Sequence, residues 1–336
     1  MVSRRPLSVA EPHADAQGRR ITYLRISVTD RCNFRCLYCM PEVGMQWLPK
    51  AEILTYEEIA AIVRQLAPLG IRRLRLTGGE PTIRPDLETL VRYLDAIPGI
   101  EDIALSTNGV KLVKKAADYR AAGIDRVNVS VDSLRPERIA KLARRDLGFD
   151  PIAALTAAQA AGLMPVKVNM VVMRGINDDE IGEMARLTLD HPWHVRFIEL
   201  MPVGDMFDLT AEHVVPSTEV LERASDALGG IEPDSDRPIG NGPAKYWRSP
   251  GSPGSIGVIT PMTHTYCGDC NRVRLTADGR LRTCLFGTHE VNFRDTLRAG
   301  GDVGPLFLQA LREKPPEHHL LAMNNGGLQA LSQIGG

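Results

Sequence analysis

Residues 32–39, Cys32-Asn33-Phe34-Arg35-Cys36-Leu37-Tyr38-Cys39, decide how the rest of this chain is interpreted. They place three cysteines in one loop with the spacing C-x3-C-x2-C, directly after a strand-like stretch over residues 23–29. Three thiolates can ligate three irons of a four-iron cluster, and this loop contains no fourth cysteine. One iron would therefore stay open to a ligand that is not protein, which is typical of a reactive site rather than a structural one.

The six cysteines of the chain form two groups of three, the second being Cys267, Cys270 and Cys284. Disulfide scaffolds spread their cysteines through small secreted chains, and an odd number in each group pairs badly, so we expect free thiols and a reducing cytoplasm. For the second group two hypotheses stay open. It is either a second cluster with one open iron or a zinc site with His264 or His289 as fourth ligand.

Composition and charge set further limits. With 336 residues, 43% of them hydrophobic and 24% charged, the chain has an ordinary globular composition. The formal net charge of −1 favours neither nucleic acid nor an anionic membrane as a partner. No apolar run approaches the roughly 20 residues of a spanning helix. Residues 1–20 are polar and lack the apolar segment of a secretory signal peptide, and we expect them to form a disordered N-terminal lead.

Hydrophobic periodicity predicts about six βα repeats over residues 21–228. The expected strands are 23–29, 72–77, 102–106, 126–131, 166–173 and 194–200. The expected helices begin at a Thr55–Glu58 capping box and at Asp86, and cover 111–122, 151–161 and 178–189. Beyond Met201 we expect the βα repeat to be lost, and the composition of residues 229–257 predicts a loop or linker. We treat residues 229–336 as a C-terminal region that carries the second cysteine group.

The strands predict which parallel architecture this is, because side chains alternate between the two faces of a strand. One face is apolar, with residues such as Leu24, Leu74, Val127 and Val168. The other face is polar: Arg25, Ser27, Thr29, Arg75, Thr77, Ala104, Ser106, Asn128, Ser130, Asp132, Lys167, Asn169 and Arg196. A doubly covered sheet is apolar on both faces, and a closed barrel is filled with branched apolar side chains. We therefore predict an incomplete (β/α)6 TIM-like barrel whose polar inner face surrounds a ligand.

Candidate site residues follow the strands of this barrel. Thr77-Gly78-Gly79-Glu80-Pro81 lets the backbone approach a ligand closely, and Ser106–Gly109 and Asn128–Ser133 end the next two strands. On their own these segments are more typical of tight turns and helix caps, but together with the polar inner face they favour contacts with a ligand. Arg272 and Arg274 lie at i and i+2, on one face of a strand, and arginine suits a bidentate grip on phosphate.

The C-x3-C-x2-C run with an aromatic residue before its last cysteine resembles the radical S-adenosylmethionine (SAM) family. Within it, nearly the whole chain from Tyr23 to Gly336 resembles the GTP 3′,8-cyclase family of molybdenum cofactor biosynthesis. The stretches that carry this resemblance are 24–32, 76–81, 128–134, 167–169, 196–201, 267–275 and the terminal Gly335-Gly336. The resemblance implies a barrel of the radical SAM type with a C-terminal cluster-binding extension.

The resemblance also implies the cofactors. Cys32, Cys36 and Cys39 would ligate a 4Fe–4S cluster that binds SAM. Tyr38, Gly79, Ser130 and Met201 would line SAM. Cys267, Cys270 and Cys284 would hold an auxiliary 4Fe–4S cluster in contact with the guanine.

For the substrate, the resemblance implies GTP bound through the residues Arg25, Arg75, Ser106, Lys167, Arg272, Val273 and Arg274. A 5′-deoxyadenosyl radical would take the 3′ hydrogen, and the ribose radical would attack C8 of guanine. Gly335 and Gly336 would reach into the active site. An electron donor such as flavodoxin or ferredoxin, and the pyranopterin monophosphate synthase as next enzyme, are the implied partners, around a monomer or homodimer.

Two other classes of protein stay open. A radical SAM enzyme that modifies a peptide would share the barrel without needing Arg272 and Arg274. A zinc-binding interaction protein would use the same cysteines without redox chemistry. Iron content separates the zinc protein from the enzymes, and nucleotide-dependent cleavage of SAM separates the two enzymes.

Overall fold

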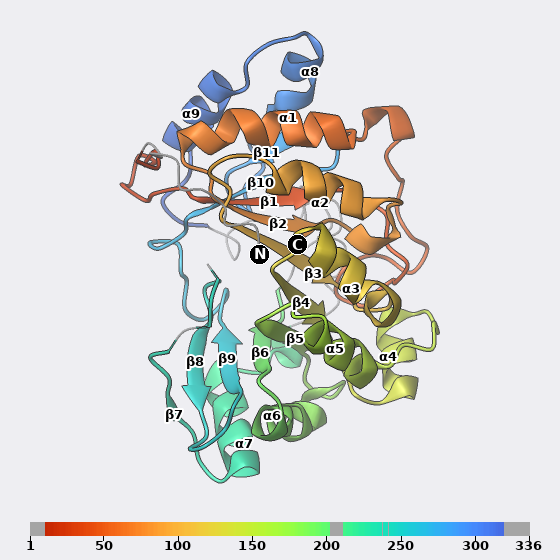
Figure 1. The fold of residues 1–336 in the computed structure, drawn as a ribbon. Coiled ribbons are helices and arrows are strands. Elements are labelled where there is room, and N and C mark those ends of the chain that lie inside the picture. Colours follow the sequence, from red (N-terminus) through yellow and green to blue (C-terminus); the bar gives the residue numbers. More distant parts are fainter. Residues whose placement is uncertain (1–10, 202–210, 237, 241, 319–336) are drawn as a thin grey trace.

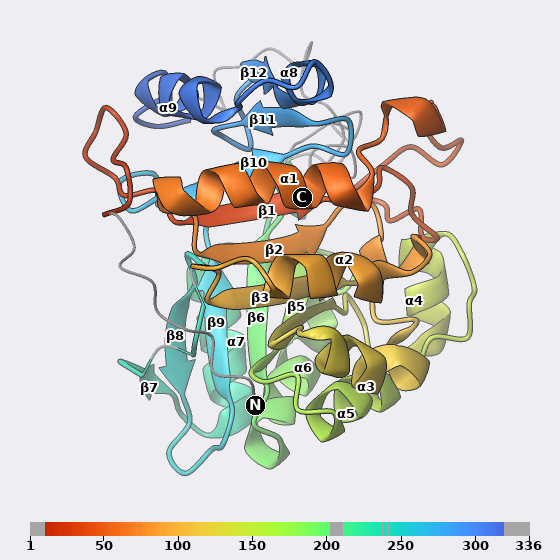
Figure 2. The ribbon, with the colours of Figure 1, turned by 45° about the horizontal axis from the view of Figure 1, so that its top comes forward.

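The computed structural model describes residues 11–201, 211–236, 238–240 and 242–318, and its strands form one continuous sheet (Figure 1). The order across the sheet is β12-β11-β10-β1-β2-β3-β4-β5-β6-β9-β8-β7, and Figure 2 shows the end from β12 to β3 as a stack. The strands are β1 (Tyr23–Ser27), β2 (Arg73–Thr77), β3 (Asp102–Thr107), β4 (Arg126–Ser130), β5 (Val166–Val172), β6 (His194–Glu199), β7 (Glu232–Pro233), β8 (Lys245–Arg248), β9 (Ser255–Ile259), β10 (Arg272–Leu275), β11 (Arg280–Arg282) and β12 (Glu290–Asn292).

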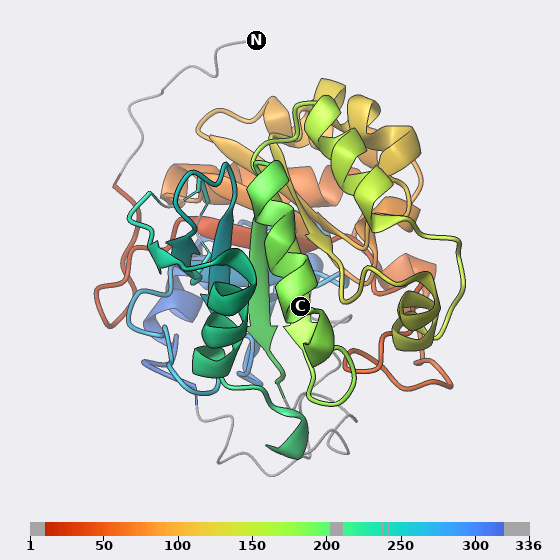
Figure 3. The same ribbon diagram turned by 90° about the horizontal axis from the view of Figure 1, so that it is seen from below.

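Helices cover the apolar face of this sheet. They are α1 (Tyr56–Leu66), α2 (Leu87–Asp95), α3 (Leu112–Ala122), α4 (Pro136–Ala143), α5 (Pro151–Ala160), α6 (Ile181–Asp190), α7 (Ser217–Leu228), α8 (Phe293–Arg298) and α9 (Gly304–Arg312). In Figure 3, α6 (green) and α7 (blue-green) lie side by side over β6 and β9. At the other end of the sheet, α8 and α9 lie against α1 (Figure 1). Among the described helices, none is long and apolar enough to span a membrane.

The six predicted strands β1–β6 are all present and parallel, and they form the incomplete barrel. The predicted start of α1 is confirmed as a capping box, in which the Thr55 hydroxyl accepts from the Glu58 amide and the Glu58 carboxylate accepts from the Thr55 amide. The prediction that Asp86 caps α2 is wrong. Asp86 precedes the helix in a left-handed conformation, with φ 55°, and its side chain makes no capping bond.

The register of the strands confirms the division into an apolar and a polar face. Leu24, Leu74 and Val127 are fully buried in the core beneath the helices. On the other face, Arg25 lies opposite both Arg75 and Arg274. Asn128, Ser106 and Lys167 align in the same way across β3, β4 and β5. The polar side chains therefore form continuous rows across the inside of the barrel.

The prediction that the βα repeat is lost beyond Met201 is wrong. α7 packs on β6, and β9 pairs parallel to β6 as a further strand of the barrel. β10 pairs parallel to β1 at the opposite end, so residues from 229 onward extend the same sheet at both ends. Residues 229–257, predicted as a loop, contain β7, β8 and the start of β9. The helical spacing of Val220, Ala224 and Leu228 signalled α7, whereas β7 and β8 are too short to give a periodicity.

The N-terminal lead is ordered where the structure describes it, and the prediction of disorder is wrong for residues 11–20. Ala14 and Arg20 form an isolated β-bridge, and Arg19 is only 8% exposed. The carboxylate of Asp15 pairs with the Arg19 guanidinium at 2.6 Å. Residues 1–10 lie outside the described part of the chain.

Candidate active site

The first cysteine loop leaves β1 and is held against α4. The Arg35 amide donates to the Ala143 carbonyl at 2.8 Å, and the Leu37 amide donates to the Leu142 carbonyl at 3.0 Å. Electrostatic interactions couple Cys36 to both Cys32 and Cys39, so the three thiols lie near one another. Burial, with the Glu80 carboxylate as the next cause, raises the pKa of the Cys32 thiol to about 12. A positive metal centre is therefore needed to turn these thiols into thiolate ligands.

The Gly78-Gly79 turn packs on the chain that leads into this loop. The Gly79 amide donates to the Thr29 carbonyl at 2.8 Å, and the Glu80 amide donates to the Arg31 carbonyl at the same distance. A Cβ on Gly79 would lie 2.1 Å from the Arg31 carbonyl oxygen, a distance that no side chain can occupy. Only glycine therefore allows the turn to lie this close to the first cysteine loop.

Glu80 joins this turn to the end of β3. Its buried carboxylate accepts from the Thr107 hydroxyl at 2.7 Å, from the Asn108 amide at 2.7 Å and from the Thr82 amide at 3.0 Å. Burial raises the pKa of Glu80 despite these donors. With so many partners within the chain, the Glu80 side chain positions the Gly78-Gly79 turn.

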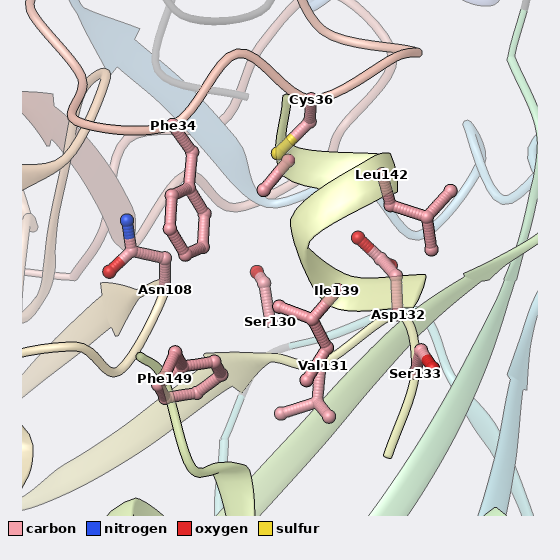
Figure 4. A pocket seen from close by; sticks show the side chains of 11 residues that line it. Phe34, Cys36, Asn108, Ser130, Val131, Asp132, Ser133, Ile139, Leu142 and Phe149 are labelled. Carbon is pink, nitrogen blue, oxygen red and sulfur yellow. The ribbon is translucent and has the colours of Figure 1, made fainter. Parts of the chain in front are cut away.

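A pocket lies between the first cysteine loop and the ends of β3 and β4 (Figure 4). Cys36 and Phe34 face it from the loop, and Ser130 and Asp132 face it from the end of β4. The Asp132 carboxylate accepts from the Tyr38 hydroxyl at 2.8 Å and from the Val171 amide at 2.9 Å, and burial raises its pKa to about 6. The structure thus brings Ser130 to the pocket and fixes Tyr38 beside it through Asp132, which lies in the predicted segment Asn128–Ser133.

The second cysteine group is assembled by the hairpin β10–β11. Arg274 lies opposite Arg282 in this antiparallel pair, which brings Cys270, just before β10, beside Cys284, just after β11. Cys267, Cys270 and Cys284 line one cavity together with Arg272 and Arg274. Burial works against ionisation of Cys270, but Arg272 and Lys314 outweigh it and lower the pKa of this thiol to about 7.

This donor set fits a cluster. Three soft sulfur ligands face a single cavity, as iron–sulfur chemistry requires. Neither His264 nor His289, the two predicted zinc ligands, lines the cavity, and His289 instead lies 3.4 Å from the Glu313 carboxylate. His318 is the histidine that lines it among the described residues. In the parts of the chain with a described structure, no three Cys, His, Asp or Glu side chains gather closely enough to hold a single metal ion.

Phe286 lies between the two cysteine groups. It packs with Cys39 and Met201 from the first site and with Cys284 from the second. Met201, predicted to line SAM, therefore lies beside the first cysteine loop. Two groups that are separated by more than two hundred positions in the sequence meet around one phenyl ring.

The predicted substrate-binding cations lie on the inner face of the barrel, and Arg272 and Arg274 also line the cavity of the second cysteine group. Arg75 is 4% exposed, Lys167 2% and Arg274 7%. Arg75 donates to the Ser106 hydroxyl at 2.9 Å and also to the Tyr23 hydroxyl. Mutual repulsion couples Arg25 to Arg274, Arg75 and Arg272, and burial together with this repulsion holds the pKa of Arg25 well below its ordinary value.

The same two causes act on the neighbouring cations. Burial, then Arg196, Arg126 and Arg75, lower the pKa of Lys167 to about 5. Burial followed by Arg272 lowers the pKa of Arg274 to about 10. A buried cluster of like charges is costly by itself. Each of these shifts would be reversed by an anion bound among the cations.

Two further inner-face cations were not predicted as site residues. Arg126 is 1% exposed and donates to the Asp102 carboxylate through Nε at 2.7 Å, while its Nη1 has no hydrogen-bond partner among the described residues. Arg196 donates through Nη2 to Asn169 Oδ1 at 2.6 Å. The alternation of side chains along β4 and β6 could have identified both residues, because each lies on the same face of the sheet as residues that were predicted to bind the substrate.

Two predictions remain, the contact of Val273 with the substrate and the role of the terminal glycines. Val273 is on the apolar face, fully buried in the core, so its side chain cannot line a substrate and only its backbone can. Gly335 and Gly336 lie outside the described residues.

A larger cavity of 420 Å³ opens beside the inner-face cations. Lys167, Arg272, Tyr266 and Tyr246 line it, and the segment before β8 closes one side. The Lys167 Nζ donates to the Ile239 carbonyl there at 2.6 Å. The volume lies within the range of small-molecule sites, about 300–1,000 Å³.

Comparison with known proteins agrees with this geometry. Residues 26–188 match the family model of the radical SAM superfamily, and residues 193–320 match the model called Molybdenum Cofactor Synthesis C. The GTP 3′,8-cyclases of Pelotomaculum thermopropionicum and Moorella thermoacetica are each 47% identical over 96% of this chain and 99% of their own length. The GTP 3′,8-cyclase of Listeria monocytogenes is 40% identical over 96% of this chain and 98% of its own.

Among solved structures, Streptococcus suis SuiB bound to the precursor peptide SuiA has a TM-score of 0.59, with 14% sequence identity over 90% of this chain and 67% of that one. At this identity the likeness shows the fold alone. The family models and the curated relatives, in contrast, cover the barrel and its C-terminal extension together. The chain therefore belongs to the GTP 3′,8-cyclase family of the radical SAM superfamily.

Proposed function

We propose that this protein is a GTP 3′,8-cyclase that catalyses the first step of molybdenum cofactor biosynthesis and uses two 4Fe–4S clusters and SAM. The observation that carries the proposal is the buried layer of cations on the inner face of the barrel, which reaches the second cysteine group through Arg272 and Arg274. The pKa values of Arg75, Lys167 and Arg274 are lowered by burial and by neighbouring cations such as Arg126, Arg196 and Arg272. This layer is costly without an anion, and a nucleoside triphosphate supplies about four negative charges at its position.

The first cysteine group and its surroundings hold the radical source. Cys32, Cys36 and Cys39 would ligate the first cluster, and Gly79, Ser130, Tyr38 and Met201 would surround SAM. When bound, the cluster and SAM would supply the radical chemistry by which the 3′ hydrogen of GTP is removed and C3′ is joined to C8 of guanine. The rings of Phe34 and Phe149 form part of the pocket wall and would exclude water from it. They pack edge to face, with their centroids 6.4 Å apart.

The inner face and the second cysteine group hold the substrate. Arg25, Arg75, Ser106, Lys167, Arg272 and Arg274 bind GTP, with charge-assisted hydrogen bonds from the guanidinium groups to the phosphates. Arg126 belongs to the same layer. Asp102 fixes its guanidinium and leaves Nη1 for an anion. Cys267, Cys270 and Cys284 would ligate the second cluster beside Arg272 and Arg274, at the part of the site proposed for the guanine.

The buried inner-face cations favour a nucleotide over a peptide substrate. A peptide backbone carries no charge that would offset the inner-face cations, and burying such cations without counter-charge is unfavourable. Four further points stay predictions. They are flavodoxin or ferredoxin as the electron donor, pyranopterin monophosphate synthase as the next enzyme, a role of Gly335 and Gly336 in the active site, and a monomeric or homodimeric state.

The proposal is tested on the full chain after anaerobic reconstitution of its clusters. We expect about eight irons per chain with matching sulfide, and 5′-deoxyadenosine that forms with a reductant, SAM and GTP together. ATP, which carries the same phosphates, is the matched control and should not support the reaction. Two zinc ions without sulfide would contradict the proposal, as would cleavage of SAM that is indifferent to GTP.

A further inference from the structure

Lys314 is a buried lysine beside the second cysteine group, to which the proposed function assigns no role. It follows α9 and is 3% exposed. Its Nζ lies 3.7 Å from Cys270 Sγ and 3.2 Å from the Arg272 carbonyl oxygen, and it also donates to the Thr283 carbonyl. An ammonium group has three donors, and these three acceptors use all of them.

The two carbonyl acceptors of Lys314 lie at the two ends of the hairpin β10–β11. The Arg272 carbonyl lies just beyond Cys270 at the start of β10, and Thr283 directly precedes Cys284 after β11. Lys314 thus joins the two ends of the hairpin that carry ligands. It holds Cys270 and Cys284 at a fixed separation and directs an N–H group toward one of the sulfurs.

The chain after Lys314 is fastened to the third ligand. Arg19 donates from Nη1 to the Cys267 carbonyl at 2.8 Å and to the Pro316 carbonyl at 2.9 Å, and from Nη2 to the Pro315 carbonyl at 2.7 Å. Asp15 holds the same guanidinium through Nε at 2.6 Å. Two consecutive prolines restrict the backbone further. The position of the Lys314 backbone is therefore fixed relative to the whole cysteine group.

We propose that Lys314 positions the second cluster and raises its reduction potential by donating an N–H···S hydrogen bond to the Cys270 thiolate. Hydrogen bonds to the sulfurs and nearby positive charge are among the levers by which proteins set the potential of iron–sulfur clusters. Reduction adds negative charge to the cluster, so a donor and a cation beside one sulfur stabilise the reduced form. The inference rests on the proposed function, because it requires a cluster at the second group.

The test measures the midpoint potential of the second cluster by redox titration followed by electron paramagnetic resonance. The parent is the reconstituted full chain with Cys32, Cys36 and Cys39 replaced by alanine, so that the second cluster gives the only signal. Lys314→Met removes donor and charge at similar length, and Lys314→Arg keeps both. Lys114→Met, at an exposed position of α3, is the matched control.

We expect Lys314→Met to shift the midpoint potential to a more negative value, and Lys314→Arg and Lys114→Met to stay close to the parent. Full iron content with an unchanged potential in Lys314→Met would overturn the inference and leave the proposed function intact. If Lys314→Met loses its iron, Lys314→Gln decides, because it removes the charge and its side chain is one atom shorter, so that its amide ends farther from the Cys270 sulfur. A more negative potential in this variant supports the inference, and an unchanged one overturns it. A parent without a four-iron cluster would overturn the proposed function itself.

Discussion

At the scale of single residues, the inner face of the barrel is defined by cations that repel one another. Arg75, Lys167 and Arg274 are almost fully buried, and each has a pKa below its ordinary value. Their strands hold them there because opposite-face neighbours such as Leu74 and Val168 are committed to the core. The folded protein thus tolerates an unfavourable layer of charge that a bound triphosphate would relieve.

Replacement of Arg274 by alanine tests this layer at one residue. The triphosphate loses a charge-assisted partner, so we expect GTP affinity to fall roughly 10- to 100-fold, in line with the 1.5–3 kcal/mol of such bonds. Calorimetric titration of the reconstituted protein with GTP measures the change. Arg312→Ala, at an exposed position ending α9, should bind GTP like the parent. Equal affinities in the Arg274→Ala protein and the parent would remove Arg274 from the site.

Lys167 makes the affinity for GTP depend on pH. With a pKa of about 5, against an ordinary 10.5, the amine is neutral at pH 7 in the free protein. A bound triphosphate favours the ammonium form, so the complex holds more protons than its separate components. Affinity for GTP should therefore rise as pH falls from 8 toward 5, by at most about tenfold per unit, and level off below 5.

The comparison for this prediction is Lys167→Met, measured over the same pH range. The terminal phosphate of GTP has an ionisation of its own near pH 6, and its contribution remains in the variant. The difference between the two profiles is therefore the contribution of Lys167. Parallel profiles would show that Lys167 does not change its protonation when GTP binds.

At the scale of elements, the site depends on loops that approach each other closely. The Gly78-Gly79 turn lies on the chain before Cys32, the hairpin β10–β11 pairs Cys270 with Cys284, and Phe286 joins both groups. The sequence predicts the first cysteine loop and the Gly-Gly turn, because both follow strands. The meeting of the two groups at Phe286 could not be predicted, since no local pattern encodes a contact between such distant segments.

The variant Gly79→Ala tests the contact between the turn and the first cysteine loop. Its Cβ would overlap the Arg31 carbonyl, so the backbone before Cys32 must move. We expect the first cluster to lose occupancy, with about four of eight irons retained and cleavage of SAM abolished. Gly268→Ala adds a methyl that meets no described atom within 4 Å, and should keep both clusters. Iron analysis of the two proteins decides, and full occupancy with normal SAM cleavage in Gly79→Ala would contradict the assignment.

At the scale of the whole molecule, the six βα repeats of the barrel follow from hydrophobic periodicity. The polar inner face also follows, because alternation along each strand is a local property. The strands β9 and β10 could not be placed in the same way. Each joins the sheet through pairing with β6 or β1, far away in the sequence. The order of residues 11–20 has a similar origin, since it depends on contacts of Arg19 with Cys267 and Pro316.

The whole molecule therefore holds a radical source, a triphosphate site and a second cluster in one barrel. The most direct test is the fate of the hydrogen at C3′ of GTP. When the reconstituted protein turns over with SAM, a reductant and GTP carrying deuterium at C3′, mass spectrometry should find that deuterium in 5′-deoxyadenosine. Unlabelled 5′-deoxyadenosine formed at an undiminished rate would contradict the account, because the radical would then take its hydrogen from somewhere other than the ribose of GTP.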